Sequence, residues 1–462
     1  MVRLMDDSRF MYSVNPTTGE QLAEYEAHSP ATARARLDAA AETFRDWSRR
    51  TVEARGAVLA RAAELLRERR DELARLATLE MGKTLGSAEG EVDKCAWTCE
   101  HFAREAPALL APEPVATDAR NSFVRHDPLG VLLAIMPWNF PYWQAFRAAV
   151  PALVAGNVVA LKHASNVTGC ALAMERLWRD AGLPEHAFTV LLVPGARAAL
   201  LVEHPAVAAV TLTGGEPAGI AVAEASGRSL KKVVLELGGS DPFIVLADAD
   251  VSLASRQAAI ARTVNNGQSC IAAKRFIVVE EVAYAFEQAF ARWLGELRVG
   301  DPLERDTDVG PLARADLVGE LERQVNGTRT AGATLLLGGR ALERPGYFFP
   351  PTLLTRVTPG MPAFDEETFG PVATVTRARD ASHAVELANQ SRFGLGASVW
   401  TADVPAALEL ARSLEVGGVF MNATVRSDPR LPFGGVRRSG HGRELGAWGL
   451  KEFVNAKTVW VG

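Results

Sequence analysis

The sequence predicts an α/β protein with two lobes, and three features indicate this. The chain has 462 residues, which is long for one hydrophobic core, so a cleft between lobes is expected. From residue 131 onward, short apolar runs alternate with helical segments, a pattern typical of a doubly wound parallel sheet. A second alternating series follows Glu236.

The first part of the chain predicts helices, and the strands of the first series follow. Between residues 30 and 110, Ala, Leu, Arg and Glu dominate, and apolar positions recur every three and four residues. The apolar runs that come next have the length of strands buried on both faces. They cover residues 131–136, 158–162, 188–193, 209–213, 232–237 and 242–246.

The second series predicts another α/β lobe. A helix is expected over residues 251–264, and strands over 275–280, 372–377, 397–401 and 417–422. The last run, 453–461, has high β-propensity and follows a glycine-rich loop at 434–446. It is suited to pairing with an edge strand of its own chain or of another subunit.

Composition argues against several classes of function. Apolar residues make up 48% of the chain and the net charge is −5, so nothing indicates binding to nucleic acid or to an anionic membrane. The longest apolar stretch, 148–161, is interrupted by proline, glycine and asparagine and is too short to span a bilayer. A cytoplasmic protein is expected, because charges stand where a signal peptide has its apolar core, at Arg3, Asp6, Asp7 and Arg9.

The four cysteines, Cys95, Cys99, Cys170 and Cys270, form no disulfide framework. No His or Cys stands at metal-binding spacing near the first two, so we expect neither a metal nor a structural disulfide. Only Cys270 lies in a Gly/Asn/Ser turn directly after a helical pattern, where a backbone amide and solvent can reach the sulfur.

Glu236 ends a strand-like run and is followed by two glycines, a place where parallel sheets present reactive groups. With Cys270 it suggests a thiol nucleophile and a carboxylate base. Taken singly, each has a more ordinary interpretation, as a core cysteine and a solvated strand end. Asn139, in the stiff turn PWNFP at 137–141, is either an amide donor for an oxyanion or the cap of the next helix.

Five motifs in order resemble those of the aldehyde dehydrogenase superfamily. They are PWNFP at 137–141, ELGG at 236–239, GQSC at 267–270, EETFGP at 366–371 and PFGG at 432–435. The resemblance covers nearly the whole chain, from residue 15 to the C-terminus. It implies that Cys270 is the nucleophile, Glu236 the base and Asn139 the oxyanion donor.

The resemblance also implies a reaction. The Cys270 thiolate adds to an aldehyde, and the Asn139 amide and the Cys270 N–H hold the oxyanion. The thiohemiacetal gives up a hydride to a nicotinamide and becomes a thioester. Glu236 then activates the water that releases the acid.

The expected dinucleotide site has no Gly-x-Gly-x-x-Gly motif. By resemblance, Lys162 and Ser165 face the adenosine ribose, although a lysine ending a buried strand often only reaches solvent. Ser165 stands where NAD-preferring relatives often carry a glutamate, so NADP is expected, with NAD as the alternative. Gly215 replaces a common serine, which predicts weaker binding. The remaining cofactor contacts implied are Trp138, Gly214, Leu237, Glu367 and Phe369.

The substrate is expected to be a short aldehyde carrying a carboxylate. Arg147, with Trp143 and Gln144, is placed to turn toward the mouth of the aldehyde channel, and it resembles the carboxylate-binding arginine of the succinate-semialdehyde branch. Ser427 resembles a second contact of that branch. Val264 stands where some members have another arginine. In the alternative interpretation, Arg147 points outward and the arginines near Ser427 are solvated.

The leading hypothesis is NAD(P)-dependent oxidation of succinate semialdehyde to succinate. The alternatives are a dehydrogenase for uncharged aliphatic or aromatic aldehydes, a cofactor-free thiol hydrolase and a catalytically silent member. A hydrolase lacks a histidine in any motif with Cys270. The family implies a homodimer or homotetramer with a dinucleotide-binding Rossmann-like lobe (1–112 and 131–236), a catalytic lobe (237–430) and a β oligomerisation arm (113–130 and 445–462).

Overall fold

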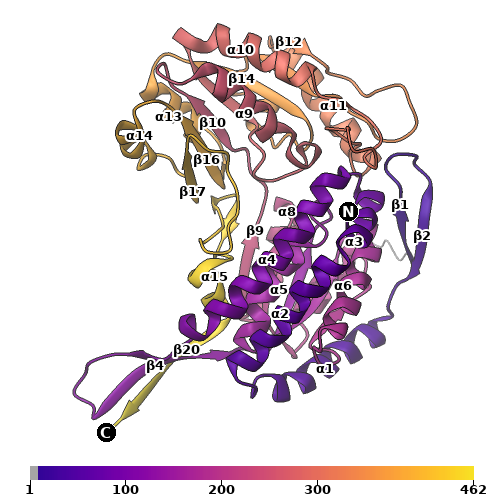
Figure 1. Cartoon of the computed structure of the whole chain (residues 1–462), viewed down its shortest axis with the longest axis vertical. Helices are drawn as coiled ribbons and strands as arrows, with labels where there is room; N and C mark the ends of the chain where they lie inside the picture. The colour runs from indigo at the N-terminus through magenta and orange to yellow at the C-terminus, as the bar shows by residue number, and fades with distance from the viewer. Residues whose placement is uncertain (1–8) are drawn as a thin grey trace.

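The computed structural model describes residues 9–462, and it confirms an α/β architecture with parallel sheets (Figure 1). Residues 1–8 of the predicted first lobe, with Arg3, Asp6 and Asp7, lie outside the described residues. Two large sheets form the centres of two lobes, which are violet to magenta and red to orange in Figure 1. The domain limits drawn from the sequence stay a prediction.

The N-terminal part is a hairpin followed by helices. Strands β1 (Phe10–Val14) and β2 (Gln21–Glu26) pair antiparallel. The next 80 or so residues form α1 (Pro30–Trp47), α2 (Val52–Glu68), α3 (Arg70–Met81) and α4 (Leu85–Leu109). Ser29, Thr51 and Thr84 cap the first, second and fourth of these helices through their hydroxyls. Helix α4 packs against α2, α3 and α5 (Trp143–Ala155), so one of its faces reaches the centre of the molecule.

The first large sheet has the order β19-β9-β8-β5-β6-β7. Its parallel strands are β5 (Val131–Met136), β6 (Val158–His163), β7 (Phe188–Val190), β8 (Val207–Thr213) and β9 (Lys232–Glu236). The short β19 (Gly440–His441) joins β9 antiparallel and brings the C-terminal part of the chain back to this sheet. Its other helices are α6 (Thr168–Asp180), α7 (Ala198–Val202) and α8 (Glu216–Arg228).

The second large sheet has the order β12-β13-β14-β11-β10-β16-β17. Strand β10 (Pro242–Val245), within the lobe predicted at 237–430, pairs with β11 (Arg275–Val279) and β16 (Gly396–Trp400) of this sheet. The other strands are β12 (Thr334–Leu337), β13 (Thr352–Thr355), β14 (Val372–Ala378) and β17 (Gly418–Met421). The helices are α9 (Val251–Thr263), α10 (Glu280–Gly295), α11 (Ala315–Thr330), α12 (Pro362–Asp365), α13 (Ala381–Asn389) and α14 (Val404–Ala411).

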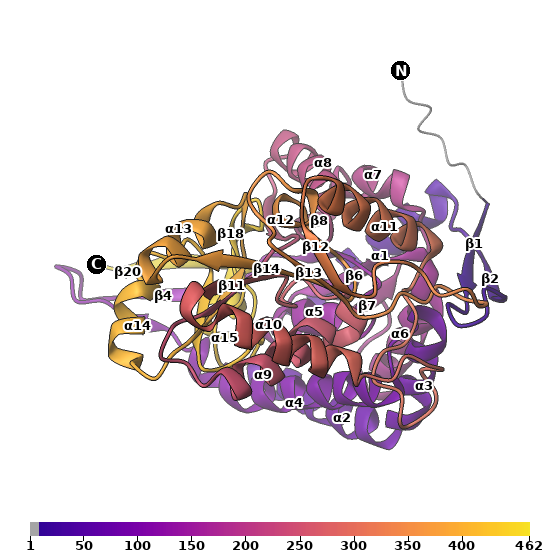
Figure 2. The ribbon, with the colours of Figure 1, turned by 90° about the horizontal axis from the view of Figure 1, so that it is seen from above.

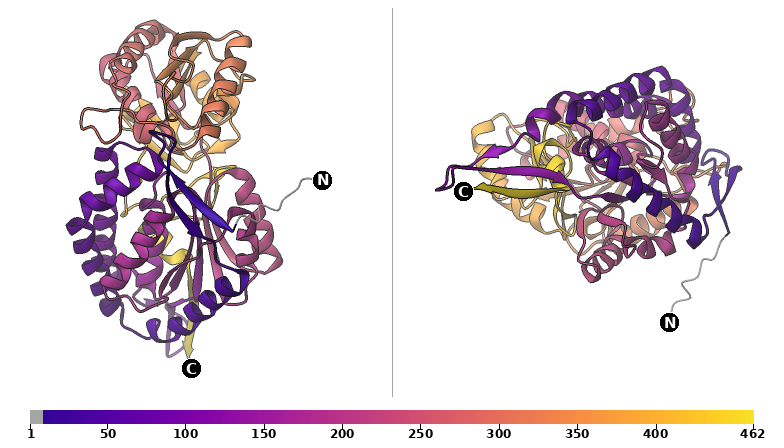
Figure 3. Two further views of the ribbon diagram at one scale, coloured as in Figure 1. Left: turned by 90° about the vertical axis from the view of Figure 1, so that its right-hand side faces the viewer. Right: turned by 90° about the horizontal axis from the view of Figure 1, so that it is seen from below.

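A third, small sheet projects from the body. Strand β20 (Val454–Val461) pairs antiparallel with β4 (Asn121–Pro128), which also pairs with β3 (Glu113–Pro114). Figures 1 and 2 show the β4–β20 ribbon extending away from both lobes, and the right panel of Figure 3 shows the same projection from below. Helix α15 (Gly446–Glu452), which precedes β20, packs against both α5 and β20.

None of the helices formed by residues 9–462 combines the length and the apolar composition needed to cross a membrane. The four cysteines are all unpaired. Among the described residues, no group of three or more His, Cys, Asp or Glu side chains is arranged to hold a metal ion.

Candidate active site at the junction of two cavities

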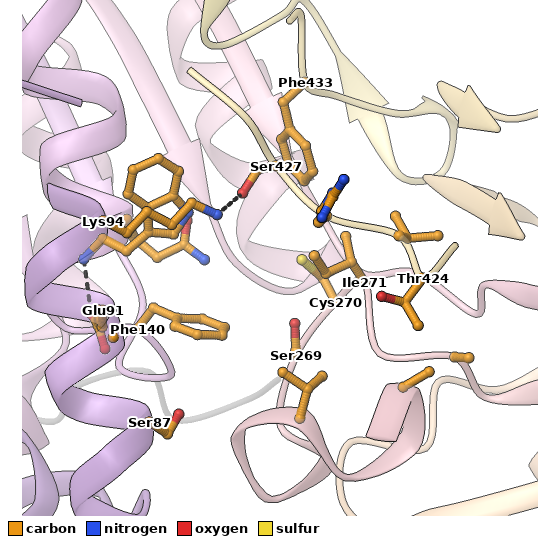
Figure 4. A pocket seen from close by; sticks show the side chains of 18 of the residues that line it. Ser87, Glu91, Lys94, Phe140, Ser269, Cys270, Ile271, Thr424, Ser427 and Phe433 are labelled. Carbon is orange, nitrogen blue, oxygen red and sulfur yellow. Dashed lines mark hydrogen bonds between the residues drawn. The ribbon is translucent and has the colours of Figure 1, made fainter. Parts of the chain in front are cut away.

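Cys270 lies where two cavities meet. One, of about 280 Å³, is lined by residues of α4, α5, the Cys270 loop and the loop before Phe433, and we call it the Lys94 cavity (Figure 4). The other, of about 220 Å³, is called the Trp138 cavity. Cys270 and Gln144 line both. A reactive thiol at this position can therefore meet two different ligands, one from each side.

The loop that carries Cys270 is held by an unusual backbone. Helix α9 ends at Thr263, and Asn265 and Asn266 then adopt left-handed conformations, with φ of 56° and 59°. Asparagine tolerates this region better than most residues. Gly267 also has positive φ, and a Cβ there would lie 2.3 Å from the carbonyl carbon of Gly370. This tight turn directs Cys270 into the space between the lobes.

The two asparagines also bind across the molecule. Asn265 Nδ2 donates to the carbonyl of Asn139 at 2.7 Å. Asn266 Nδ2 donates to the carbonyls of Gly82 and Pro311 at 2.8 and 3.0 Å, and its Oδ1 accepts from an amide of the same loop. Asn265 and Asn266 thus form the turn with their backbone and bind other segments with their side chains. These contacts fix the Cys270 thiol relative to both lobes.

Asn139 faces the Trp138 cavity and does not cap a helix. The first amides of α5, those of Tyr142 and Trp143, are bound by the Glu91 carboxylate at 2.7 and 2.8 Å. Asn139 Nδ2 donates one hydrogen bond, to the carbonyl of Gln268 at 3.1 Å. Its second N–H is left for a ligand, so the helix-cap interpretation from the sequence is wrong and the donor interpretation stays a prediction.

Burial disfavours the thiolate in this state of the protein. Desolvation raises the pKa of Cys270 to about 12, although the nearby charges of Arg147 and Lys274 act in the opposite direction. Lys274 Nζ donates to the carbonyls of Ser269 and Cys270 at 2.9 and 2.7 Å. Its charge is partly balanced by Glu367, 3.4 Å away. A proton acceptor or a further positive charge is needed to form the thiolate at neutral pH.

The buried Arg147 acts on two carboxyl groups, on Glu444 through an ion pair and on Glu236 through its charge. Arg147 is ion-paired with Glu444, and its Nη2 donates to Thr213 Oγ1 at 3.2 Å. Glu236 is 2% exposed, and its Oε1 has no hydrogen-bond partner. Desolvation raises the pKa of Glu236 well above its ordinary value; Arg147 opposes this and Glu444 adds to it. A carboxyl group whose pKa is raised by burial is suited to acid–base work.

Arg147 lines the Lys94 cavity together with Trp143, Gln144 and Ser427, and their roles as substrate contacts stay a prediction. Its guanidinium is only 2% exposed and also lies 4.8 Å from the centre of the Phe433 ring. The ion pair with Glu444 balances its charge. Arg147 therefore offers little net positive charge to a ligand in this cavity.

Lys94, from α4, is a second cation of this cavity, and sequence reasoning missed it. Its Nζ donates to Ser427 Oγ at 2.6 Å and lies 4.4 Å from the centre of the Trp143 ring (Figure 4). Burial and, to a smaller extent, the charge of Arg147 lower the pKa of Lys94 to about 8. In the sequence it is one of several charged residues in the predicted helical segment, and nothing local marks it. Glu444 was also missed, although its GREL segment closely follows PFGG.

The expected cofactor contacts fall into two groups. Trp138, Leu237, Glu367 and Phe369 line the Trp138 cavity, as do the glycines 214 and 215. The rings of Trp138 and Phe369 meet edge to face, with centroids 5.7 Å apart. Glu367 accepts a hydrogen bond from the amide of Gly239 at 3.1 Å.

Lys162 and Ser165 lie apart from this cavity, at the C-terminal end of β6 and in the turn that follows it. Lys162 is 6% exposed, and within residues 9–462 its ammonium forms neither a hydrogen bond nor an ion pair. Burial lowers its pKa to about 8. An unpaired cation at this edge of a parallel sheet is suited to an anionic group of a ligand.

Comparisons with known proteins show which family the chain resembles over nearly its whole length. Residues 4–459 match the model of the aldehyde dehydrogenase family. A probable NADP+ succinate-semialdehyde dehydrogenase from Synechocystis is 51% identical, over 97% of this chain and 99% of its own. An NAD(P)+ succinate semialdehyde dehydrogenase from Escherichia coli is 47% identical, over 97% of each chain. The solved succinic semialdehyde dehydrogenase of Streptococcus pyogenes, in complex with NADP+, has a TM-score of 0.95 at 34% identity, covering 98% of this chain and 99% of that one.

Proposed function

The chain belongs to the aldehyde dehydrogenase family, and we propose that it oxidises succinate semialdehyde to succinate with NADP+ as the hydride acceptor. The observation that carries the proposal is the place of Cys270 between the two cavities. An aldehyde with a carboxylate enters the Lys94 cavity, and the nicotinamide enters the Trp138 cavity. Cys270 reaches both.

In the first step, Cys270 attacks the aldehyde carbon. Its proton leaves to a neighbouring base, since burial keeps the pKa of the thiol high. The oxyanion accepts hydrogen bonds from the second N–H of Asn139 and from the amide of Cys270. Such a donor contributes about 3–4 kcal/mol of transition-state stabilisation.

In the later step, Glu236 takes a proton from water so that the hydroxide attacks the Cys270 thioester. Its Oε1 has no hydrogen-bond partner among the described residues, so it can accept a hydrogen bond from that water. Arg147 lowers the pKa of Glu236 and thereby favours the carboxylate that acts as the base. Glu444, paired with the same arginine, moderates this effect.

Bound NADP+ supplies the acceptor for the hydride that leaves the thiohemiacetal. The unpaired, buried ammonium of Lys162 fits the 2′-phosphate, and Ser165 lies close by in the chain without adding a negative charge. Trp138, Phe369 and Glu367 would hold the nicotinamide end. Gly215, at the start of α8, offers only its backbone to the phosphates, which supports the expected weaker binding.

The test is a panel of aldehydes with NADP+ and NAD+, followed at 340 nm. Succinate semialdehyde with NADP+ should give the highest kcat/KM, about tenfold or more above butanal, because a carboxylate gains a charge-assisted contact. Equal or better use of butanal or benzaldehyde would contradict the substrate assignment. Hydrolysis of esters or amides without any aldehyde-dependent absorbance would instead indicate a thiol hydrolase.

The proposal includes a cytoplasmic homodimer or homotetramer. The four unpaired cysteines support a reducing compartment. The projecting β4–β20 ribbon supports an arm that pairs between subunits, because β20 lies at an open edge of its sheet.

A further inference from the structure

We propose that Lys94 binds the carboxylate of the aldehyde substrate beside Ser427, the contact already expected from the resemblance, and so determines which aldehydes the enzyme prefers. The inference rests on the proposed function and deepens it, since it names the atoms that recognise the charged end of the substrate. The two side chains come from α4 and from the loop before Phe433, on one wall of the Lys94 cavity, across from Cys270 in Figure 4.

The first argument is the charge of the cavity. Among the described residues, Lys94 has no carboxylate within 4.0 Å, and its polar contact is the Ser427 hydroxyl. Glu91, the acidic residue that lines the cavity, already binds Lys83 and the first amides of α5. Arg147 is balanced by Glu444. The ammonium of Lys94 is therefore the positive charge that a ligand can use most fully.

The second argument is the direction of the hydrogen bonds. An ammonium can only donate, so the Ser427 oxygen accepts from Lys94 and its own O–H must donate elsewhere. Lys94 keeps two more N–H donors. Together the pair offers donors and a positive charge at one point of the cavity, which is what a carboxylate requires.

The third argument is that Lys94 is held in place before any ligand binds. The Trp143 ring lies 4.4 Å from Nζ, and the Ser427 bond is 2.6 Å long. Fixing a lysine in advance lowers the entropy lost when the carboxylate binds. Arg426 also lines this cavity, but its side chain is exposed, so solvent weakens its charge.

The test compares Lys94→Met with Arg426→Met, which removes the exposed cation of the same cavity. Lys94→Met should lower kcat/KM for succinate semialdehyde about tenfold to a hundredfold, mainly through KM, and leave butanal within about threefold. Arg426→Met should change both substrates by less than about threefold. Retained butanal oxidation also shows that Lys94→Met has folded. The conservative variant Lys94→Arg should keep part of the kcat/KM for succinate semialdehyde that Lys94→Met loses.

A readout other than turnover uses iodoacetamide. Succinate should slow alkylation of Cys270 in the wild type, and much less in Lys94→Met or Ser427→Ala. Equal losses on succinate semialdehyde and butanal, or unchanged protection by succinate, would overturn the role of Lys94 and leave the proposed function standing. If the wild type itself does not prefer succinate semialdehyde to butanal, the proposed function fails and the role of Lys94 fails with it.

Discussion

At the scale of single residues, the site contains ionisable groups that are buried, and burial disfavours the charged form of each of them. Desolvation raises the pKa of both Cys270 and Glu236, and it lowers the pKa of Lys94 and Lys162 to about 8. Each of these groups is thus less charged in the free protein than in water. We expect ligands of opposite charge to shift the two lysines back toward the charged form.

The role of Glu236 as the base for hydrolysis predicts a stalled variant. Glu236→Gln cannot take a proton from water, so hydrolysis of the thioester should fall about a hundredfold or more. The first hydride transfer should still occur, because it does not need that water. Stopped-flow absorbance at 340 nm should show a burst of about one NADPH per site, followed by slow turnover. Absence of the burst would mean that Glu236 acts before hydride transfer.

The pKa of Lys94 predicts how substrate binding depends on pH. Burial and then Arg147 lower this pKa to about 8, while Cys95, Asp428 and Glu91 raise it slightly. Below pH 8 the free enzyme carries the ammonium, and above it the neutral amine. KM for succinate semialdehyde should therefore rise above pH 8, approaching tenfold per pH unit, while KM for butanal stays level.

Initial rates between pH 6.5 and 9.5 measure this dependence. The rise should disappear in Lys94→Met and move to higher pH in Lys94→Arg, whose guanidinium stays charged. An identical rise in wild type and Lys94→Met would show that another group causes it.

At the scale of elements, the turn that carries Asn139 is attached to strand β6. His163, at the end of β6, has Nε2 2.7 Å from the carbonyl of Pro141, and its Nδ1 accepts from the amide of Ala164 at 3.0 Å. The amide bond to Nδ1 fits the neutral imidazole with its proton on Nε2, while the carbonyl of Met136 also lies 3.1 Å from Nδ1. Burial lowers the pKa of His163 to about 4.

This pKa predicts a loss of stability in mild acid. The unfolded chain takes up the proton near pH 6.5 and the folded protein near pH 4. The contribution of the neutral His163 to the free energy of unfolding is therefore present above pH 6.5. It is lost as pH falls toward 4, with a magnitude of about 3 kcal/mol. In urea unfolding, the free energy of unfolding should fall less over this pH range for His163→Gln than for the wild type. His441→Gln, which changes an exposed histidine, should behave as the wild type.

Strands and motifs that depend only on neighbouring residues in the chain were predictable from the sequence. The buried runs of the first sheet stand within a few residues of their predicted limits, because apolar runs of that length encode strands directly. The left-handed Asn265 and Asn266 were not anticipated, and the helix expected to reach 264 ends at Thr263. Their conformation depends on partners far away in the chain, such as Gly82.

The same reason explains what was missed in the site. Lys94 meets Ser427 only because α4 packs against α5 and the C-terminal loop folds back over it. Glu444 reaches Arg147 because β19 returns to the first sheet. Neither contact leaves a local pattern. The motifs around Cys270, Glu236 and Asn139 do, and they were enough to indicate the chemistry.

At the scale of the whole molecule, the projecting ribbon predicts assembly. Trp460 on β20 is 54% exposed, and a large aromatic side chain on an open edge strand favours a partner surface. The wild type should sediment as a multiple of its 49.6 kDa chain, and Trp460→Asp should shift the distribution toward the monomer.

Sedimentation velocity at micromolar concentration measures this shift. Tyr284→Asp is the matched control, because Tyr284 is an exposed aromatic residue on α10, away from the ribbon. A monomeric wild type, or an equal effect of both substitutions, would contradict assembly through the arm.

The side chain of Asn266 has a consequence for how the enzyme loses activity on heating. It bonds at once to the end of α3 in one lobe and to the loop at residues 310–311 in the other, within four positions of the nucleophile. The lobes cannot part at this point while the nucleophile loop keeps its shape. Residual activity after heating should therefore report the first separation of the lobes, before either sheet melts.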